Sequence, residues 1–221
     1  MKKSIVLGTN NLKKRHELEL LFADCNVELK TLRDFDNSIE VVEDGVTFSQ
    51  NADKKAAEQA KHLNQWVLAE DSGLIVDLLK DEPGVYSARF GALKKMQREN
   101  GYASLTQAAE IHPEIHSSDL QNNQTLLEVL QNVPMEKRTA YYCCFMSLAN
   151  PQGEIVARTN GQCRGRILTQ PFGENGFGYD PYFEIVEFHL TFGLLAPEVK
   201  SCISHRARAA RQLIPILKRL K

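Results

Sequence analysis

The feature that most constrains the fold of this chain is a β-hairpin pattern in its second half. Residues 139–149 are rich in β-branched and aromatic side chains, and the turn-forming sequence Asn-Pro-Gln-Gly follows at residues 150–153. Residues 154–158 then provide a returning strand. A cluster of turn residues between two strand-like runs is typical of a tight hairpin. The sequence therefore predicts two antiparallel strands that pair within one sheet.

The first half of the chain instead alternates between short apolar strands and amphipathic helices. Strands are expected at residues 4–8 and 66–69, and helices at residues 14–22 and from Thr47 onward. Asn11 is a suitable N-cap for the first of these helices. Alternating strands and helices followed by a hairpin predict a mixed α/β fold.

The remaining segments complete one continuous domain. A helix is expected around residues 126–130, irregular structure at residues 171–181, and a last helix from near Ser204 to Leu217. No repeat, low-complexity tract or flexible linker interrupts the chain. Residues 1–221 are therefore expected to form a single domain.

Composition excludes several classes of protein. The 221 residues are 43% apolar, enough for a substantial core, and 27 Lys and Arg against 28 Asp and Glu give a net charge of −1. A general polyanion-binding role is therefore disfavoured. No apolar run approaches the roughly 18 residues of a membrane span, so a cytoplasmic protein is expected. The five cysteines are odd in number and lack Cys-x-x-Cys spacing, which favours reduced, mostly buried thiols.

The charge is nevertheless concentrated in three segments. Residues 2–16 carry five basic side chains and no acid, residues 34–53 carry six acids and no base, and residues 199–221 carry seven basic side chains and no acid. Solvated surfaces explain most of these charges. A fold that brings the three segments together would place cationic donors beside carboxylates, as a magnesium-phosphate site requires.

The connection between the first strand and the first helix has the outline of an anion site. Small polar residues and backbone N–H groups stand at a helix N-terminus, where anions are favoured, and two lysines follow. No Gly-x-x-x-x-Gly-Lys-Ser/Thr sequence is present, so this is not a Walker loop. An ordinary capped helix with solvated lysines would explain the segment equally well.

Asp71 is a candidate for metal binding and catalysis. It is expected where a buried strand ends and a Ser-Gly turn begins, a place where α/β folds expose functional side chains. With its neighbour Glu70 it could hold Mg²⁺ and orient a water molecule. Glu43, in an acidic turn before the second helix, could supply a further oxygen. Alternatively, Asp71 caps the turn through a hydrogen bond to the backbone.

Two further segments suggest contacts with a nucleotide. Glycines flank Phe177, and we expect both Phe177 and Tyr179 to be exposed as a platform for stacking a base. Arg206 lies with His205 at the start of the last helix. Because the helix dipole disfavours cations there, we expect an anion nearby. Arg206 offers donors only, so its guanidinium could bind either a keto oxygen or a phosphate.

Taken in order, these motifs resemble the inosine triphosphate pyrophosphatase family, also called Ham1-like or non-canonical purine NTP pyrophosphatases. The matching blocks span residues 9 to about 210. They are Thr9-x-Asn11-x-x-Lys14-x-x-Glu17, Phe48-x-x-Asn51-Ala52-x-x-Lys55-Ala56, Glu70-Asp71-Ser72-Gly73-Leu74 with Pro83-Gly84-Val85-Tyr86-Ser87-Ala88-Arg89, Gly176-Phe177-Gly178-Tyr179-Asp180-Pro181, and Lys200 with Ser204-His205-Arg206.

The resemblance implies a Mg²⁺-dependent hydrolase that converts ITP, dITP and XTP to the monophosphate and pyrophosphate, and so removes them from the nucleotide pool. It implies an elongated α/β fold, with a mixed sheet, flanking helices and two lobes around a central nucleotide-binding cleft. It further implies a cytoplasmic homodimer with no membrane partner and no stable nucleic-acid partner. Residues 92–121 exceed the family's usual connection and are expected to be an insertion.

The resemblance also assigns roles to individual residues. Asp71 is the expected general base, and Glu43 and Asp71 are the expected metal ligands. The expected substrate-binding residues are Thr9, Asn10, Asn11, Leu12, Lys13, Lys14, Lys55, Ser72, Phe177, Gly178, Tyr179, Asp180, Lys200, His205 and Arg206.

Two alternative functions remain open. One is a house-cleaning pyrophosphatase that acts on other modified nucleotides. The other is a nucleotide-sensing or nucleic-acid-binding protein that uses the basic segments at both ends of the chain, for which binding would depend steeply on salt and would not need Mg²⁺.

Overall fold

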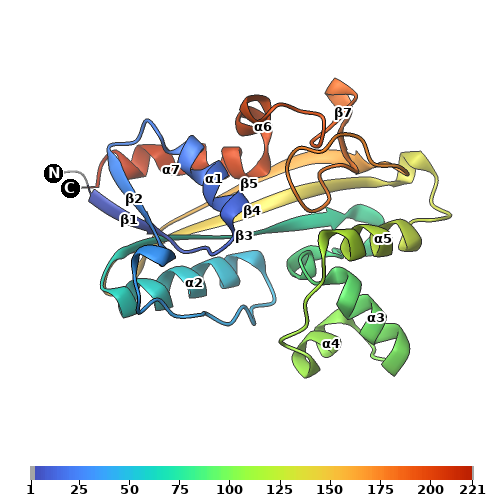
Figure 1. The fold of residues 1–221 in the computed structure, drawn as a ribbon, viewed down its shortest axis with the longest axis horizontal. Coiled ribbons are helices and arrows are strands. Elements are labelled where there is room, and N and C mark those ends of the chain that lie inside the picture. Colours follow the sequence, from blue (N-terminus) through green and yellow to red (C-terminus); the bar gives the residue numbers. More distant parts are fainter. Residues whose placement is uncertain (1–2, 221) are drawn as a thin grey trace. The chain divides into compact units, whose positions relative to one another are not determined.

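The computed structural model describes residues 3–220, and Figure 1 shows the arrangement of their strands and helices. The strands are β1 (Lys3–Leu7), β2 (Val27–Thr31), β3 (Trp66–Val76), β4 (Thr139–Ala149), β5 (Ile155–Ile167), β6 (Phe183–Ile185) and β7 (Leu190–Thr191). The α-helices are α1 (Leu12–Leu21), α2 (Phe48–Leu63), α3 (Phe90–Asn100), α4 (Leu105–Ile111), α5 (Asp119–Val129), α6 (Pro197–Ile203) and α7 (His205–Leu217). Short 3₁₀ helices occur at Leu32–Asp34, Asp77–Leu79, Gly84–Tyr86, Met135–Lys137 and Val186–Phe188.

Within residues 3–220 the strands form one open sheet in the order β2-β1-β3-β4-β5-β6-β7. β1 pairs in parallel with β2 and β3, whereas β5 and β6, and β6 and β7, pair antiparallel. The predicted hairpin joins β4 and β5, and the Asn150 N–H donates to the Glu154 carbonyl at 3.0 Å across its turn. The sheet is therefore mixed, as the sequence predicts.

The chain divides into two compact units. Unit 1 holds the described residues up to Ser72, together with Cys143–Cys163 and the segment from Glu198 onward. Unit 2 holds Gly73–Tyr142 and Arg164–Pro197. Each unit therefore combines segments that are far apart in the sequence.

In unit 1, alternate residues of β3 serve two separate cores. Leu68 packs in a core with Leu213 of α7, whereas Val67 and Ala69 pack in a second core with Ala56 of α2. Successive side chains of a strand point to opposite faces, and Figure 1 shows α1 and α7 on one side of β1 and β3 and α2 on the other. Polar side chains further along β3 therefore also point alternately to these two faces of the sheet.

The helix starts follow from capping side chains. The Asn11 carboxamide accepts hydrogen bonds from the N–H groups of Lys13 and Lys14, so α1 begins at Leu12, two residues before the expected start. Thr47 caps α2 in a capping box. Ser204 caps α7, which confirms the expected start of the last helix.

The predicted turn at residues 70–73 is wrong, because β3 runs without interruption from Trp66 to Val76. Ser72 and Gly73 are turn-forming residues, but the neighbouring strand β4 is also eleven residues long. Backbone pairing along the sheet outweighs a local turn preference here, as it often does for single polar or glycine residues in strands. Asp71 therefore lies within a buried strand rather than at its end.

Unit 2 contains helices that the sequence analysis did not predict. α3 and α4 lie largely within residues 92–121, the expected insertion, and α3 packs on both α4 and α5. The predicted helix around residues 126–130 is confirmed as α5, and residues 171–181 form neither helix nor strand, as expected. β5 continues well past residue 158, to Ile167.

The five cysteines are free thiols, four of them buried and only Cys202 exposed, which confirms the expected reduced and mostly buried state. Across residues 3–220, helices fall short of the length and apolar character that crossing a bilayer demands.

Candidate functional site

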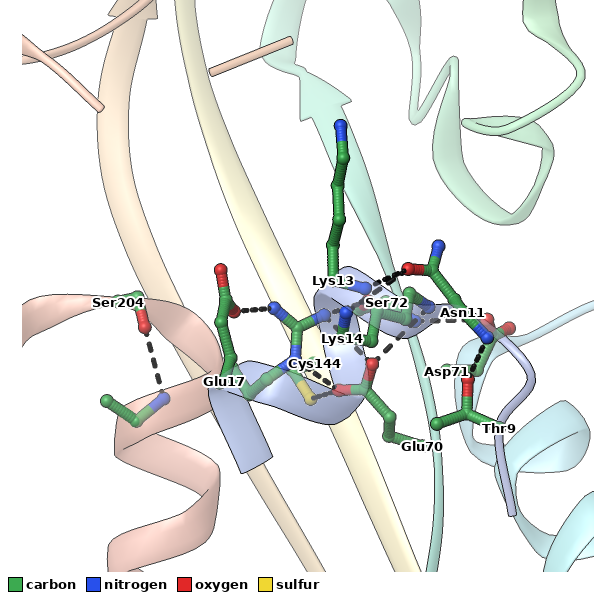
Figure 2. Close-up of polar contacts among 12 residues, drawn as sticks. Thr9, Asn11, Lys13, Lys14, Glu17, Glu70, Asp71, Ser72, Cys144 and Ser204 are labelled. Carbon is green, nitrogen blue, oxygen red and sulfur yellow. Dashed lines mark hydrogen bonds and ion pairs between the residues drawn. The ribbon is translucent and has the colours of Figure 1, made fainter. Parts of the chain in front are cut away.

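Arg206, in the first turn of α7, is the centre of a buried group of charges in unit 1. Its side chain is 1% exposed. Nε and Nη2 donate to the two carboxylate oxygens of Glu70, each at 2.8 Å, and Nη2 also donates to Ser72 Oγ at 3.1 Å. Nη1 donates to Glu17 of α1. Figure 2 shows the side chains of Glu17, Glu70 and Ser72, three of these partners, gathered in one place.

Two lysines complete this group. Lys200 Nζ donates to Glu17 Oε1 at 2.8 Å, and Lys14 Nζ lies 3.4 Å from Glu70 Oε1. We call Lys14, Glu17, Glu70, Lys200 and Arg206 the Arg206 cluster. Cationic side chains from both ends of the chain therefore gather around Glu70, next to Asp71 in sequence.

The carboxylates of the Arg206 cluster are held in their ionised form. Burial alone would raise the pKa of Glu70, but Arg206 and Lys14 hold it well below its usual value. Burial is likewise the largest influence on Glu17, and Arg206 and Lys200 reverse it, so the pKa of Glu17 is lowered. Cys144 Sγ donates a further hydrogen bond to Glu70 Oε2 at 2.9 Å. Glu70 is therefore a permanent counter-charge.

His205, next to Arg206, is buried at 4% exposure. Burial, followed by the positive charges of Arg206 and Lys200, holds its pKa well below the usual value. The imidazole is therefore neutral at pH 7.

The anion expected near the start of α7 is supplied by the protein itself. Glu70 and Glu17 already neutralise Arg206, and Glu17 also binds Lys200. A buried guanidinium needs such partners, since an isolated buried charge is very costly. The anions that the helix start requires are protein carboxylates.

Asp71 belongs to a different group of residues, on the α2 side of β3. Asn51 Nδ2 donates to Asp71 Oδ2 at 3.0 Å. Lys55 Nζ lies 3.7 Å from Asp71 Oδ1 and 2.9 Å from Glu43 Oε2. We call Glu43, Asn51, Lys55 and Asp71 the Asp71 cluster.

The pKa of Asp71 is raised, in contrast to that of Glu70. Burial is the largest cause, Lys55 and Lys14 oppose it, and Glu43 adds to it. Asp71 is 6% exposed, and the Ser72 N–H donates to its Oδ1 at 3.0 Å. A buried carboxylate that is not fully neutralised is suited to accept a proton. Asp71 thus has the physical character of a general base.

Glu70 and Asp71, considered as a possible metal-binding pair, do not point to the same place. Adjacent residues of an extended strand point to opposite faces, and both oxygens of Glu70 are bound by Arg206. The pair was inferred from a turn that is absent. Glu43 and Asp71 instead share one ammonium, that of Lys55.

Glu43 and Asp71 fit a magnesium ion as two of its ligands. Both carboxylates approach the same cationic atom, Lys55 Nζ, so they converge on a place that accepts positive charge. Among residues 3–220, no three His, Cys, Asp or Glu side chains gather closely enough to hold a metal without other ligands. Mg²⁺ commonly takes one or two carboxylates and completes its shell with water and substrate phosphates, which matches this donor set.

The loop before α1 already uses several of its backbone donors. Thr9 Oγ1 accepts from the Asn11 N–H at 3.2 Å, and Asn11 caps Lys13 and Lys14. Asn10, Leu12 and Lys13 are exposed. Figure 2 shows the Lys13 side chain directed away from Glu17 and Glu70. The structure therefore brings Lys14 into the charged centre of unit 1 and leaves Lys13 at the surface.

The predicted aromatic platform lies in unit 2 and differs from expectation in one respect. Tyr179 is 3% exposed, and its hydroxyl donates to the Ser87 carbonyl at 2.8 Å, so it is buried rather than exposed. Asp180 is also buried and accepts from the Phe177 N–H at 2.9 Å. Phe177 is half-buried, between Gly176 and Gly178. Tyr179 and Asp180 therefore anchor the loop that presents Phe177.

Sequence reasoning assigned no site role to Glu17, Asn51 or Cys144. Glu17 follows Lys14 by three positions and so shares its face of α1, and Asn51 precedes Lys55 by four positions on α2. Those spacings were a usable signal. Nothing local marks Cys144, whose contact with Glu70 joins residues 74 positions apart.

Fold and site together define an α/β protein in which one strand of a mixed sheet separates two clusters of carboxylates and cations. The comparisons with known proteins specify the class further. The family model described as "Ham1 family" matches residues 5–216. The chain belongs to the Ham1 family.

Individual relatives match over nearly their full length. A protein of Rhodopirellula baltica named dITP/XTP pyrophosphatase is 48% identical over 216 residues, covering 98% of this chain and 93% of that protein. The solved structure of the Staphylococcus aureus Ham1 protein has a TM-score of 0.76 at 33% identity, covering 98% of each chain. A nucleoside-triphosphatase / dITP/XTP pyrophosphatase from Mycobacterium abscessus has a TM-score of 0.69 at 36% identity, covering 96% of this chain and 99% of that one.

Proposed function

We propose that this protein is a Mg²⁺-dependent nucleoside triphosphate pyrophosphohydrolase. It converts dITP, ITP and XTP to the monophosphate and pyrophosphate and so removes them from the nucleotide pool. The names of relatives such as the R. baltica protein support this substrate class. The observation that carries the chemistry is the Asp71 cluster, in which a buried carboxylate with a raised pKa faces a lysine and a second carboxylate.

In this proposal Asp71 removes a proton from the water that attacks the α-phosphate. Asn51 holds Oδ2, and the lone pairs that remain on the carboxylate are the proton acceptors. Lys55 and Lys14 both lower the pKa of Asp71 against the effect of burial, which favours the ionised carboxylate that a base requires. The same two lysines can neutralise charge that develops on the departing pyrophosphate.

The charge balance of unit 1 favours a divalent cation. The two clusters hold four cationic side chains and four carboxylates among the described residues, namely Lys14, Lys55, Lys200 and Arg206 against Glu17, Glu43, Glu70 and Asp71. Side chains that neutralise one another cannot fully compensate a triphosphate. Glu43 and Asp71 would hold Mg²⁺, which when bound supplies positive charge and lowers the pKa of coordinated water.

The remaining substrate contacts stay predictions from the family resemblance. Arg206 would have to donate to the 6-keto oxygen of the purine base while it keeps its hydrogen bonds to Glu70 and Glu17. For unit 2, the predicted contacts are Phe177, Gly178, Tyr179 and Asp180. A cytoplasmic homodimer is likewise proposed from the resemblance, and sedimentation of the purified protein would measure its oligomeric state.

Initial rates of pyrophosphate release test the proposed function. We expect dITP and XTP to be hydrolysed much faster than ATP, GTP or dTTP, with activity lost when EDTA removes Mg²⁺. Equal rates for dITP and dTTP would instead favour a pyrophosphatase for other modified nucleotides. Salt-sensitive binding of oligonucleotides without any hydrolysis would favour a nucleic-acid-binding protein.

A further inference from the structure

In unit 2, two side chains of α5 form hydrogen bonds to the backbone of a single residue, Gly178, which follows Phe177. Asp119 Oδ2 accepts a hydrogen bond from the Gly178 N–H at 2.8 Å. Asn123 Nδ2 donates to the Gly178 carbonyl at 2.9 Å. Both backbone polar groups of the residue that follows Phe177 are therefore bound by one helix.

The spacing of the two α5 side chains and the backbone conformation around Phe177 both suit these hydrogen bonds. Asp119 and Asn123 are four positions apart, so they lie on one face of α5. Gly178 has φ +61° and Gly176 has φ +78°, values that glycine adopts far more readily than other residues. A loop with such flexible residues on both sides of Phe177 needs external hydrogen bonds to hold one conformation.

α5 is itself hydrogen-bonded to its neighbours, so its two side chains hold Gly178 from a fixed position. Asn122 Oδ1 accepts from the Gly91 N–H of α3 at 2.8 Å, and Asn122 Nδ2 donates to the Ala88 carbonyl at 3.2 Å. A Cβ at Gly91 would come within 2.9 Å of the Gln121 backbone, so α3 and α5 are in close contact. The three consecutive residues from Gln121 to Asn123 thus join the helices to each other and to the loop.

We propose that Asp119 and Asn123 are positioning residues that hold Phe177 in place to stack on the base of the nucleotide. This inference rests on the proposed function, because it assumes that Phe177 contacts the substrate. Stacking on the base does not change as the phosphate bond breaks, so the contribution is the same in the ground state and the transition state. Loss of the hydrogen bonds from Asp119 and Asn123 to Gly178 should then raise KM and leave kcat nearly unchanged.

The test is a KM-against-kcat comparison for four variants with dITP. Asp119→Ala and Asn123→Ala each remove one hydrogen bond and should raise KM about two- to tenfold. Asp119→Asn keeps an oxygen acceptor for the Gly178 N–H and should restore KM to near the wild-type value. Gln124→Ala changes an exposed neighbour on the same helix and is the matched control.

Two inhibitors separate positioning from general damage. Inosine monophosphate carries the base, whereas inorganic tripolyphosphate carries phosphates only. Asp119→Ala and Asn123→Ala should weaken inhibition by inosine monophosphate by the same factor as KM and leave inhibition by tripolyphosphate unchanged. Thermal unfolding of each variant checks that it is folded, and Asp119→Ala supplies the answer if Asn123→Ala, at a buried position, does not fold.

The outcomes are distinct. Wild-type KM values in folded Asp119→Ala and Asn123→Ala would overturn the inference, as would an equal loss of affinity for inosine monophosphate and tripolyphosphate. Failure of the wild-type protein to hydrolyse dITP would refute the proposed function instead. A rise in KM confined to the two alanine variants, with recovery in Asp119→Asn, would support the inference.

Discussion

The two clusters in unit 1 are built on adjacent residues of one strand, yet their electrostatics are opposite. Glu70 has both oxygens bound by Arg206, and its pKa is lowered. Asp71 faces Asn51 and a more distant Lys55, and its pKa is raised. Burial favours the neutral form of both carboxyl groups, so the difference comes from the closer cationic partner of Glu70 and from Glu43, which raises the pKa of Asp71.

The comparison separates a supporting role from a reactive one. The Arg206 cluster joins α1, β3, α6 and α7 by charges that neutralise one another, as a structural network should. In the Asp71 cluster, by contrast, the raised pKa of Asp71 means that its carboxylate accepts a proton more readily than an ordinary aspartate. Four variants test this division of roles, in order of decreasing effect.

Asp71→Asn should have the largest effect on activity. The amide can still accept a hydrogen bond from Asn51 but cannot accept a proton from water, and loss of a general base typically costs about 10²–10⁴-fold in rate. Pyrophosphate release from dITP at saturating Mg²⁺ is the measurement. A turnover within tenfold of wild type would remove Asp71 as the base.

Arg206→Met should have the largest effect on stability. It leaves Glu70 and Glu17 buried without their main partner, and breaking a buried ion pair in this way costs about 3–5 kcal/mol. Urea unfolding measures the loss. Arg208→Met, at an exposed position on the same helix, is the control and should change stability little. If both variants were equally stable, the Arg206 cluster would not support the fold.

Lys55→Met should shift the pH dependence of activity. Lys55 lowers the pKa of Asp71, so its removal raises that pKa, and the acidic limb of kcat/KM should move to higher pH. Lys54→Met is the control, because Lys54 pairs with Asp44 at an exposed position. An acidic limb that stays in place in Lys55→Met would mean that another group titrates.

Cys144→Ala should have the smallest effect. It removes one hydrogen bond to Glu70 and should cost about 1 kcal/mol of unfolding free energy. Cys144→Ser keeps a donor at this position and should recover most of the loss. Equal stability of the alanine and serine variants would show that the contact with Glu70 contributes nothing.

The sequence predicted elements well where local signals agree. Asn11, Thr47 and Ser204 all cap the helices that they were expected to cap. The β4–β5 hairpin formed because strand-like runs and turn residues point to the same structure. The error at residues 70–73 arose because Ser72 and Gly73 favour a turn, whereas pairing within the sheet decides their conformation.

The sequence indicated several residues of the candidate site but not the contacts that they make with one another. The concentration of charge in separate segments indicated that Lys14 and Arg206 would lie near the acidic segment at residues 70–71. That Glu70 would bind Arg206 instead of sharing a metal with Asp71 depends on strand alternation, which a predicted turn conceals. Tyr179 was expected at the surface because its burial depends on a contact with Ser87, 92 positions away.

Urea unfolding of Glu70→Gln and Asp71→Asn at pH 7 tests the opposition between the two carboxylates most directly. A lowered native pKa means that the ionised form of Glu70 stabilises the fold, and a raised one means that the ionised form of Asp71 destabilises it. Neutralising Glu70 should therefore lower the free energy of unfolding, and neutralising Asp71 should raise it. A shift of the same sign in both variants would contradict the account.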